Sequence, residues 1–337
     1  MGFKIGIVGA TGAVGRTMLE VLEKSSVPVS ELRLFASERS AGQILTFRGA
    51  DVRVETLTQE AMREGFDYLL FSAGADVSRR YAPIAAEVGT TVIDNSSAFR
   101  MVPEIPLVVP EINGHLLKGY RGIVANPNCS TIQMVLALYK VHDKYQLHEI
   151  FVSTYQAVSG AGHKAIVEYE RQLSGDDSHS VFVRQIAHNV IPLIGDLKDD
   201  ISQEEWKMIN ETKKILNSKA LAVFPTTVRV PVRIGHSESV IARTLFPIMS
   251  KEDLIETIAS GEDVVVHDDI VTPLEVAGDD YVHVSRVRLF DAQTFGLWVV
   301  ADNLRVGAAT NAVRILKLHS ELNNPTVERE VEEVERR

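Results

Sequence analysis

The sequence predicts an α/β fold in which a doubly wound, mostly parallel sheet is joined to an α+β domain with a mixed or antiparallel sheet. In the first part of the chain, short apolar runs alternate with helix-like segments, the order typical of parallel sheets. The later runs VVVHD, HVSRVRLF and FGLWVVADN predict antiparallel pairing. The chain has 337 residues, more than one ordinary core holds, so two domains are expected.

Charge and composition exclude several functional classes. The chain has 35 Lys and Arg against 45 Asp and Glu, a net charge of −10, so nucleic acid is not an expected partner. One cysteine rules out an intramolecular disulfide. No signal peptide, apolar run of membrane-spanning length or metal-ligand cluster is recognisable, so we expect a cytoplasmic protein without a membrane or metal partner.

The first strand-like run leads directly into a glycine-rich turn. Residues 3–8 (FKIGIV) precede GATGAVG, and the amphipathic stretch RTMLEVLEK follows. Gly9 and Gly12 would allow a tight turn close to a pyrophosphate, while Gly15 would let the helix pack against the strand. The helix start supplies N–H groups and a partial positive charge for phosphates. We therefore expect a Rossmann-type dinucleotide-binding domain.

The segment after the next strand bears on cofactor choice. The run at 32–36 is followed by Ser37, Glu38, Arg39 and Ser40. This is the distance from the glycine turn at which an acidic residue would bind the ribose of NAD. An arginine between two serines is better suited to the 2′-phosphate of NADP, because all three side chains can donate to it. This favours NADP, although Glu38 leaves the strength of that preference open.

Further strand-like runs lie at 68–72, 90–94, 106–109 and 122–126. Ser72 is the last residue of the first run and Gly74 follows it, at the strand end where ligands sit in such folds. Arg100, in SSAFRM, is expected near the same cleft.

The single cysteine, Cys129, lies in NPNCST between a strand and the apolar stretch IQMVLALYKV. Ser130 or Thr131 is expected to cap the helix, which would place the thiol at a helix N-terminus that lowers its pKa. A cysteine outside a disulfide is usually a small core hydrophobe, so position alone leaves both interpretations open. Beside a nicotinamide, a thiolate could form a thioester during aldehyde oxidation or acyl phosphate reduction.

Several polar residues of the second half are candidates for the same site. Gln156 lies just past the apolar body of an alternating strand, where it could hydrogen-bond a carbonyl oxygen, although a glutamine in a strand is more often simply exposed. The turn SGAG that follows, at 159–162, could lie against a nicotinamide. Glu204 and Lys207 are one turn apart in the helix-like stretch SQEEWKMINETKKIL, and for an isolated pair an ordinary ion pair on a solvated face is the preferred interpretation.

Two β-rich runs surround the turn at 235–237. His236 in that turn could carry protons near neutral pH, but nine other histidines occur in the chain. Arg229 could bind a carboxylate through two hydrogen bonds. The stretch GAATNAVRILKL returns to helix, and the charged last residues, TVEREVEEVERR, are expected to fray.

Eight motifs then stand in order along the chain: GATGAVG, SERSAG, SSAFRM, NPNCST, TYQAVSGAG, EEWK, RVPVRIGHSE and DNLRVGAA. On these motifs the chain resembles the aspartate-semialdehyde dehydrogenases of the bacterial short type over essentially its whole length. The resemblance implies an NADP-dependent, reversible interconversion of aspartate semialdehyde plus phosphate with β-aspartyl phosphate. The reductive direction would feed lysine, methionine, threonine and isoleucine synthesis.

The matching motifs also imply roles for individual residues. Cys129 would be the nucleophile that forms the acyl thioester, and His236 the acid/base that serves it. Gln156 would position the reacting carbonyl group, with Asn128 nearby.

Charged residues would bind the rest of the substrate. Arg229 would bind the α-carboxylate and Glu204 the α-amino group, while Arg100 and Lys207 would hold the phosphate. With the glycine turn and strand ends above, the candidate cofactor-binding residues are Gly9, Thr11, Gly12, Ala13, Val14, Gly15, Ser37, Arg39, Ser40, Ser72, Gly74, Ser159, Gly160 and Asn303.

The family fold further implies a discontinuous first domain. Residues 1–127 and 307–337 would form the NADP-binding domain, because the C-terminal helix, at about 307–322, would pack back onto it. Residues 128–306 would form the catalytic and dimerisation domain. The implied assembly is a homodimer, with a dimer of dimers as the alternative.

Three other functions compete with this interpretation. N-acetyl-γ-glutamyl-phosphate reductase uses the same thioester chemistry, but an acetylated amino group has no need of a carboxylate such as Glu204. Glyceraldehyde-3-phosphate dehydrogenase differs at the cysteine motif. A catalytically silent relative that only binds a nucleotide or a protein would be expected to lack Cys129 or His236.

Overall fold

The computed structural model describes residues 2–323, and the chain divides into two compact units. Unit 1 contains the residues up to Pro127 and those from Ala308 onward, and unit 2 is Asn128–Gly307. The last residues, for which fraying is expected, lie outside the described part.

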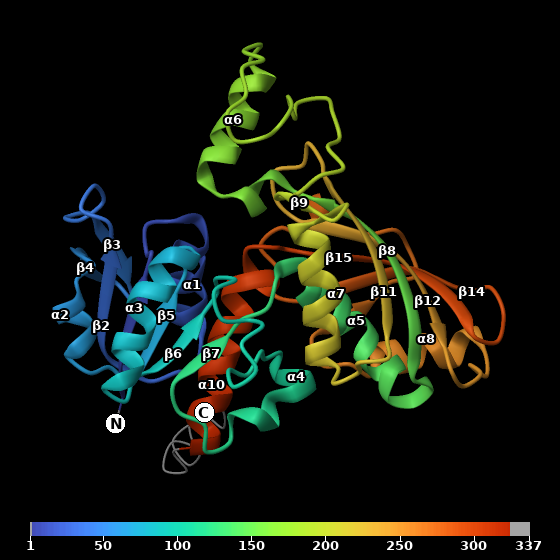
Figure 1. Cartoon of the computed structure of the whole chain (residues 1–337), viewed down its shortest axis with the longest axis horizontal. Helices are drawn as coiled ribbons and strands as arrows, with labels where there is room; N and C mark the ends of the chain where they lie inside the picture. Colours follow the sequence, from blue (N-terminus) through green and yellow to red (C-terminus); the bar gives the residue numbers. More distant parts are fainter. Residues whose placement is uncertain (1, 324–337) are drawn as a thin grey trace. The chain divides into compact units, whose positions relative to one another are not determined.

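Unit 1 is built on a seven-stranded sheet in the order β3-β4-β2-β1-β5-β6-β7 (Figure 1). All neighbours pair in parallel except β3, which is antiparallel to β4. The strands are β1 (Phe3–Val8), β2 (Val29–Ala36), β3 (Ile44–Phe47), β4 (Ala50–Thr56), β5 (Tyr68–Phe71), β6 (Thr91–Asp94) and β7 (Ile123–Ala125). This order confirms the predicted doubly wound, mostly parallel sheet.

Helices cover both faces of this sheet. They are α1 (Ala13–Lys24), α2 (Gln59–Arg63), α3 (Ala75–Glu87), α4 (Pro110–Asn113), the 3₁₀ turn Gly114–Leu117 and the C-terminal α10 (Asn311–Asn323). One core cluster joins Ile5 and Ile7 of β1 to Met18 of α1 and Ile315 of α10. A second cluster lies on the other face and joins strand residues such as Leu69 to α2 and α3. Alternate side chains of the strands thus feed two separate cores.

The expectation of a strand at 106–109 is wrong. Only Leu107 forms a bridge, to Ala125, and α4 begins at Pro110. Prolines explain the difference, because Pro106 has no N–H to donate and Pro110 is suited to the first turn of a helix.

Unit 2 contains a six-stranded mixed sheet in the order β11-β8-β12-β15-β14-β13. The strands are β8 (Leu147–Gln156), β11 (Ala222–Arg229), β12 (His236–Thr244), β13 (Val264–Val266), β14 (Val282–Leu289) and β15 (Thr294–Ala301). The pairs β8–β11 and β13–β14 are parallel and the others antiparallel. The mixed sheet confirms the predicted second domain class, but β13 does not pair antiparallel as expected for VVVHD.

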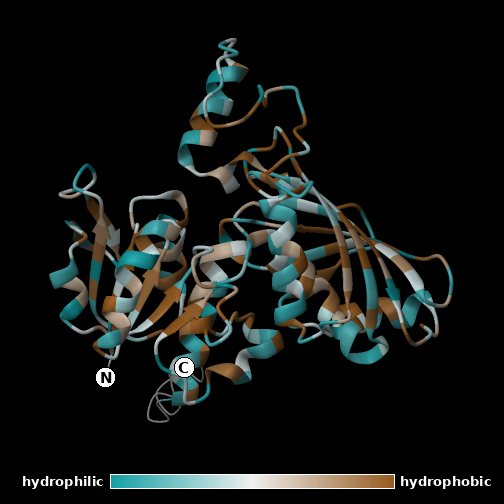
Figure 2. Ribbon diagram, in the orientation of Figure 1, coloured by the Kyte–Doolittle hydropathy of each residue, from teal (hydrophilic) through white to brown (hydrophobic). Residues whose placement is uncertain are grey.

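The helices of unit 2 are α5 (Cys129–Tyr145), α6 (His163–Leu173), α7 (Gln203–Ile215), α8 (Lys251–Ala259) and α9 (Pro273–Val276). Unit 2 also contains the 3₁₀ turn Val158–Ala161 and the short hairpin of β9 (Leu197–Lys198) and β10 (Ile201–Ser202). A π-helical segment, Arg305–Thr310, begins in unit 2 and ends in unit 1. Helix α5 is buried against one face of the sheet and also contacts α7 and α8. Figure 2 shows hydrophobic residues along the strands of this sheet.

The strand β8 alternates between buried and exposed side chains, because one face packs on α5 and the other does not. Large hydrophobic side chains remain exposed on the second face, among them Phe151, Tyr155, Phe224 and Ile241. Phe151 and Phe224 stack with ring centroids 4.9 Å apart. An apolar sheet face of this kind is typical of an interaction surface. Within residues 2–323, no helix is both long and apolar enough to cross a membrane.

Candidate active site

Cys129 is the first residue of α5, and Asn128 is its N-cap. The Asn128 Oδ1 accepts hydrogen bonds from the backbone N–H groups of Ser130 (3.0 Å) and Thr131 (3.2 Å). The expectation that Ser130 or Thr131 caps the helix is therefore wrong, because the helix starts earlier and both residues are buried in its first turn. Cys129 itself is partly exposed, unlike the core residues that follow it.

The backbone at Gly307 passes directly against the cysteine. A Cβ at Gly307 would lie 2.6 Å from the Cys129 Cβ and 3.1 Å from its Cα. No side chain fits there, so glycine is required for the chain to approach the thiol-bearing residue this closely. The sequence offered no signal for this contact, because 178 residues separate the two positions (307 − 129).

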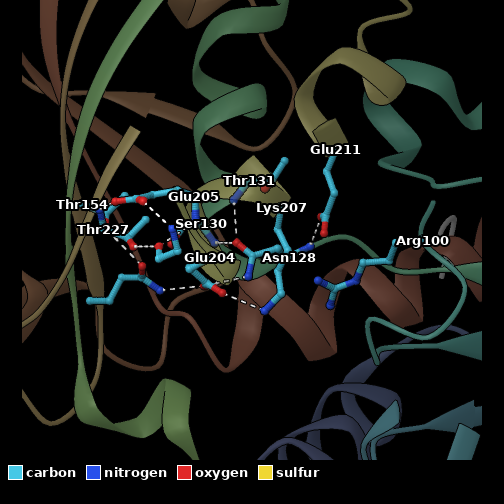
Figure 3. Close-up of polar contacts among 12 residues, drawn as sticks. Arg100, Asn128, Ser130, Thr131, Thr154, Glu204, Glu205, Lys207, Glu211 and Thr227 are labelled. Atoms are coloured by element: carbon cyan, nitrogen blue, oxygen red, sulfur yellow. Dashed lines mark hydrogen bonds and ion pairs between the residues drawn. The ribbon is translucent and has the colours of Figure 1, made fainter. Parts of the chain in front are cut away.

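A buried carboxylate, Glu204, lies at the centre of a polar network (Figure 3). Its Oε1 accepts from Asn128 Nδ2 (2.8 Å) and from Gln156 Nε2 (3.0 Å). Its Oε2 accepts from Lys207 Nζ at 2.8 Å. The network thus joins the cap of α5, the end of β8 and the first turns of α7.

The charge state of Glu204 follows from these partners. Burial raises the pKa of Glu204, but the charge and hydrogen bond of Lys207 and the hydrogen bonds from Gln156 and Asn128 outweigh it and lower the pKa to about 2. Glu204 is therefore ionised at neutral pH. The interpretation of Glu204 and Lys207 as a pair on a solvated face is wrong: the ion pair exists, but its carboxylate is buried.

A second buried carboxylate, Glu211, accepts a hydrogen bond from the backbone N–H of Asn128 at 2.6 Å. Sequence reasoning missed it, although Glu211 follows Glu204 by seven residues and so lies on the same face of α7. Carboxylates of α7 therefore hold Asn128 by both its backbone and its side chain. This fixes the residue that precedes the thiol.

Arg229 and His236 converge on Gly160. A Cβ at Gly160 would lie 3.0 Å from both Arg229 Nη1 and His236 Nε2. Arg229 is buried and donates from Nη1 to the Ala157 carbonyl oxygen at 2.6 Å. Burial lowers the pKa of Arg229, while the charges of Glu204 and Cys129 raise it. The guanidinium therefore lies within electrostatic range of the carboxylate and the thiol.

His236 is completely buried, and its Nδ1 accepts a hydrogen bond from the Ala157 backbone N–H at 3.0 Å. This bond assigns the ring hydrogen to Nε2 in the neutral form. Burial and the charge of Arg229 lower the pKa of His236 to about 3, against an opposing effect of Glu204. At neutral pH the ring is uncharged, and within the described part of the chain its Nε2 has no hydrogen-bond partner.

The turn after β8 is tied to a distant loop. The hydroxyl of Ser159 and the amide of Asn303 hydrogen-bond to each other, and Gly235 N–H donates to Asn303 Oδ1 at 2.9 Å. Asn303 thus links the turn that contains Gly160 to the backbone beside His236.

In unit 1, the glycine turn has the geometry expected for a phosphate-binding loop. Gly9 has φ +83°, and Gly12 is the N-cap of α1. A Cβ at Gly15 would lie 2.1 Å from the carbonyl oxygen of Gly9, so only glycine permits this packing. The turn therefore brings the N–H groups of Ala13 and Val14 to an open helix start.

The segment that follows β2 is exposed at Ser37 and Arg39, and Ser40 N–H closes a turn onto the Ser37 carbonyl oxygen at 2.9 Å. Three candidate donors to a 2′-phosphate are thereby grouped on one turn. Ser72 directly follows β5, and Gly74, with φ +88°, is the N-cap of α3.

Arg100 is buried in unit 1, at the carboxyl ends of two parallel strands. Its Nε donates to the Asn126 carbonyl oxygen and its Nη2 to that of Asn95, both at 2.9 Å. These bonds anchor the guanidinium beside β6 and β7.

The structure thus brings the predicted residues together in two groups. Unit 2 groups the thiol with Asn128, Gln156, Glu204, Lys207, Arg229, His236, Ser159, Gly160 and Asn303. Unit 1 contains Arg100 and the glycine turn with its neighbours. Among residues 2–323, no group of three or more His, Cys, Asp or Glu side chains could hold a metal. A thiol at a helix start, beside a carboxylate, an arginine and a neutral histidine, suits acyl transfer through sulfur.

Comparison with known proteins defines the class. Residues 4–120 match the model of the semialdehyde dehydrogenase NAD-binding domain, and residues 138–306 match that of the semialdehyde dehydrogenase dimerisation domain. The chain is thus a nucleotide-binding dehydrogenase of the semialdehyde class.

Relatives over nearly the whole chain define the family. The chain is 47% identical to aspartate-semialdehyde dehydrogenase of Aquifex aeolicus, covering 94% of this chain and 98% of the relative, and 43% identical to that of Bacillus subtilis, covering 96% and 99%. The crystal structure of aspartate semialdehyde dehydrogenase II from Vibrio cholerae superposes with a TM-score of 0.91 at 45% identity, over 94% of this chain and 98% of that one. The chain belongs to the aspartate-semialdehyde dehydrogenase family.

Proposed function

We propose that this protein catalyses the reversible, NADPH-dependent reduction of L-4-aspartyl phosphate to L-aspartate 4-semialdehyde and phosphate, through a thioester on Cys129. In the cell the reductive direction would feed lysine, methionine, threonine and isoleucine biosynthesis. A related structure from Vibrio cholerae is described as complexed with ASA, which supports this substrate.

The observation that carries the proposal is the hydrogen bond between Asn128, next to the nucleophile, and the buried, ionised Glu204. A fixed negative charge beside a thiol is unfavourable for a substrate that is only anionic, but it suits one with an α-ammonium group. An N-acetylated substrate has no such group. The carboxylate therefore favours aspartyl over N-acetyl-γ-glutamyl substrates.

The remaining polar groups fit the other parts of an aspartyl substrate. Arg229 is preorganised by its hydrogen bond to the Ala157 carbonyl oxygen and would bind the α-carboxylate. Gln156 would orient the reacting carbonyl group. Arg100 and Lys207 would hold the phosphate, which needs cationic donors.

The glycine turn and Arg39 fit a dinucleotide with a 2′-phosphate, and we propose NADP as the cofactor. The positive φ of Gly9 and the tight packing of Gly15 leave room for a pyrophosphate against the start of α1. An aspartate semialdehyde dehydrogenase structure from Candida albicans, 25% identical with a TM-score of 0.72, is described as containing NADP. When bound, the nicotinamide supplies or accepts the hydride. Ser159, Gly160 and Asn303 would contact its ring.

In the reductive direction, the Cys129 thiolate would attack the acyl carbon of aspartyl phosphate. The carbon–oxygen bond to phosphate breaks, phosphate leaves with the electron pair, and the aspartyl thioester remains on sulfur. After hydride delivery to that carbon, the carbon–sulfur bond breaks. This releases the semialdehyde and restores the thiolate.

His236 would enter this sequence as a hydrogen-bond donor. Its neutral ring carries hydrogen on Nε2, which can donate to the sulfur or to the developing oxyanion. Because Nε2 already carries hydrogen, the ring can accept a proton at Nε2 only after its hydrogen has moved to Nδ1, which ends the bond that Nδ1 accepts from Ala157. The acid/base role therefore depends on how readily this bond breaks.

We also propose a homodimer formed through the exposed face of the second sheet. Phe151, Tyr155, Phe224 and Ile241 supply an apolar surface there, and Tyr155 adjoins Trp298 with centroids 5.4 Å apart. The match of residues 138–306 to a dimerisation domain supports this surface. Sedimentation should give a dimer or a dimer of dimers, and Phe224→Glu should shift it toward monomer.

The decisive assay measures reduction of NADP by purified protein given aspartate semialdehyde and phosphate, with NAD in parallel. We expect phosphate-dependent turnover, faster with NADP. No phosphate-dependent turnover would refute the activity. Cys129→Ser should lower turnover by several orders of magnitude while NADPH affinity stays near wild type, and retained activity would exclude Cys129 as nucleophile.

A further inference from the structure

The segment 178–191, which we call the Arg229 loop, contacts Arg229 in two ways. Ile191 and Arg229 exchange backbone hydrogen bonds of 2.9 and 2.8 Å. The Phe182 ring centroid lies 6.0 Å from the Arg229 Cζ, within cation–π range. The loop therefore touches both the backbone and the charged group of this arginine.

The Arg229 loop contains no helix and only one bridging residue, Ile191. Ile186 and Ile191 of the loop belong to a small buried apolar cluster against which Phe182 packs, whereas Val181 and Val183 are exposed. Figure 1 shows α6 and the chain after it projecting from the end of the second sheet. Apolar packing therefore holds the Phe182 side chain, and polar contacts hold the backbone of the loop around it.

Two polar residues of α6 provide the backbone contacts. Glu168 and Gln172 are one turn apart, and both are buried. The Glu168 Oε2 accepts from Ser180 N (2.7 Å), Ser180 Oγ (3.0 Å) and Val181 N (2.8 Å), and its Oε1 accepts from Phe182 N (3.3 Å).

Gln172 fixes the loop on both sides of that point. Its Oε1 accepts from Ile186 N (2.9 Å) and Ala187 N (3.0 Å), while its Nε2 donates to the Ser178 carbonyl oxygen at 3.3 Å. These bonds take the place of the strand pairing that the loop lacks.

Glu168 keeps its charge in this position. Burial raises the pKa of Glu168, but the hydrogen bonds from Val181, Ser180 and Phe182 outweigh it and lower the pKa. An ionised carboxylate is the stronger acceptor, so its hydrogen bonds to the loop are stronger than those of a neutral amide in the same place.

We propose that Glu168 and Gln172 are positioning residues that hold Phe182 against the guanidinium of Arg229 and so set its orientation for the substrate carboxylate. The inference rests on the proposed function and extends it, because it assigns substrate affinity to residues that do not touch substrate. Arg229 is then fixed at Nη1 by the Ala157 carbonyl oxygen, at its backbone by Ile191, and on its face by Phe182.

The test compares Glu168→Gln, Phe182→Leu and Phe182→Tyr with the control Glu170→Gln. Glu170 is exposed on the same helix, so its variant makes the same charge change without touching the loop. Phe182→Leu should raise the KM for aspartate semialdehyde by about 3- to 30-fold and leave the KM for NADP unchanged. Phe182→Tyr keeps the aromatic face and should retain the wild-type KM.

Hydrogen exchange gives a readout that does not require activity. In Glu168→Gln the amides of residues 180–182 should exchange faster than in wild type, and in Glu170→Gln they should not. Equal exchange in the two variants would overturn the role of Glu168. An unchanged semialdehyde KM in Phe182→Leu, or a matching rise in the KM for NADP, would overturn the role of Phe182. Absence of turnover in wild type would instead defeat the proposed function, and the exchange result would still decide whether Glu168 holds the loop.

Discussion

Replacing Glu204 with glutamine is the sharpest test of the polar network in unit 2. The substitution keeps the shape of the side chain and removes its charge. Glu204 accepts hydrogen bonds from three donors, Asn128, Gln156 and Lys207. A glutamine amide presents one accepting oxygen and one donating nitrogen, so at least one of these donors would face another donor.

The pKa of Glu204 sets the magnitude. Lowering it from 4.5 to about 2 corresponds to roughly 3 kcal/mol of folding free energy at pH 7. Because the folded-state pKa is the lower one, this stabilisation is complete above about pH 4.5 and is lost as the pH falls through about 2. Glu204→Gln should therefore be less stable than wild type at pH 7, with a difference that narrows between those values.

Tryptophan fluorescence can follow this unfolding, because both tryptophans, Trp206 and Trp298, lie in unit 2. Urea titrations from pH 7 down to pH 3 would give the free energy of unfolding for wild type, Glu204→Gln and Glu87→Gln. Glu87 is exposed at the end of α3 in unit 1 and controls for the loss of one charge. A difference between wild type and Glu204→Gln that stays constant over this range would refute the reasoning.

The same variant tests substrate recognition. Loss of a charged hydrogen bond to the α-ammonium group should lower kcat/KM for aspartate semialdehyde by roughly 10- to 150-fold. Turnover of succinate semialdehyde, which has no amino group, should change far less. An equal loss for both aldehydes would mean that Glu204 does not bind the amino group.

Three further substitutions test other parts of the structure. Gly307→Ala should displace Cys129 and lower kcat by at least 100-fold, an estimate of roughly 3 kcal/mol from overpacking, with NADPH affinity unchanged; a wild-type kcat would show that the contact tolerates a methyl group. Burial raises the pKa of Glu238 well above 4.5, against a smaller opposing effect of the Gln133 side chain, so its folded form favours the proton and stability falls as the pH rises above the ordinary value. Glu238→Gln should therefore gain stability relative to wild type at pH 8 more than at pH 5, by up to about 1.4 kcal/mol per pH unit, and a gain that is smaller at pH 8 would contradict this. Arg39→Ala should raise the KM for NADP by roughly 10-fold or more and leave that for NAD nearly unchanged, and equal effects on both would exclude a 2′-phosphate contact.

The features that the sequence predicted well are those encoded by local patterns. The first strand, the glycine turn and α1 follow one another within 24 residues, so short-range geometry decides them. The alternation of β8 is equally local, because side chains of a strand point to opposite faces in turn. The prediction of a strand at 106–109 was wrong for a local reason as well, because the prolines at its start and just after its end outweighed its apolar character.

The features that the sequence did not reveal depend on contacts between distant segments. Glu204 and Lys207 have the spacing of an ordinary surface pair, and only the packing of α7 against α5 and β11 buries the carboxylate. Its partners Asn128 and Gln156 are 76 and 48 residues away. The burial of Glu168 was likewise not predictable from the sequence, because a charged residue in an amphipathic helix is normally expected on the solvated side.

Under the proposed function, the position of Lys207 would link substrate recognition to phosphate binding. In the structure the Lys207 ammonium group forms an ion pair with the Glu204 carboxylate. The proposed function assigns this same carboxylate to the amino group of the substrate. Both cations would compete for one buried negative charge, so arrival of the substrate ammonium group would weaken the ion pair between Glu204 and Lys207. The lysine is half-buried on a flexible stem and can then turn toward the phosphate, the other role proposed for it. One carboxylate would thereby couple binding of the substrate amino group to the release of Lys207 for phosphate binding. A substrate without an amino group would not release Lys207 in this way.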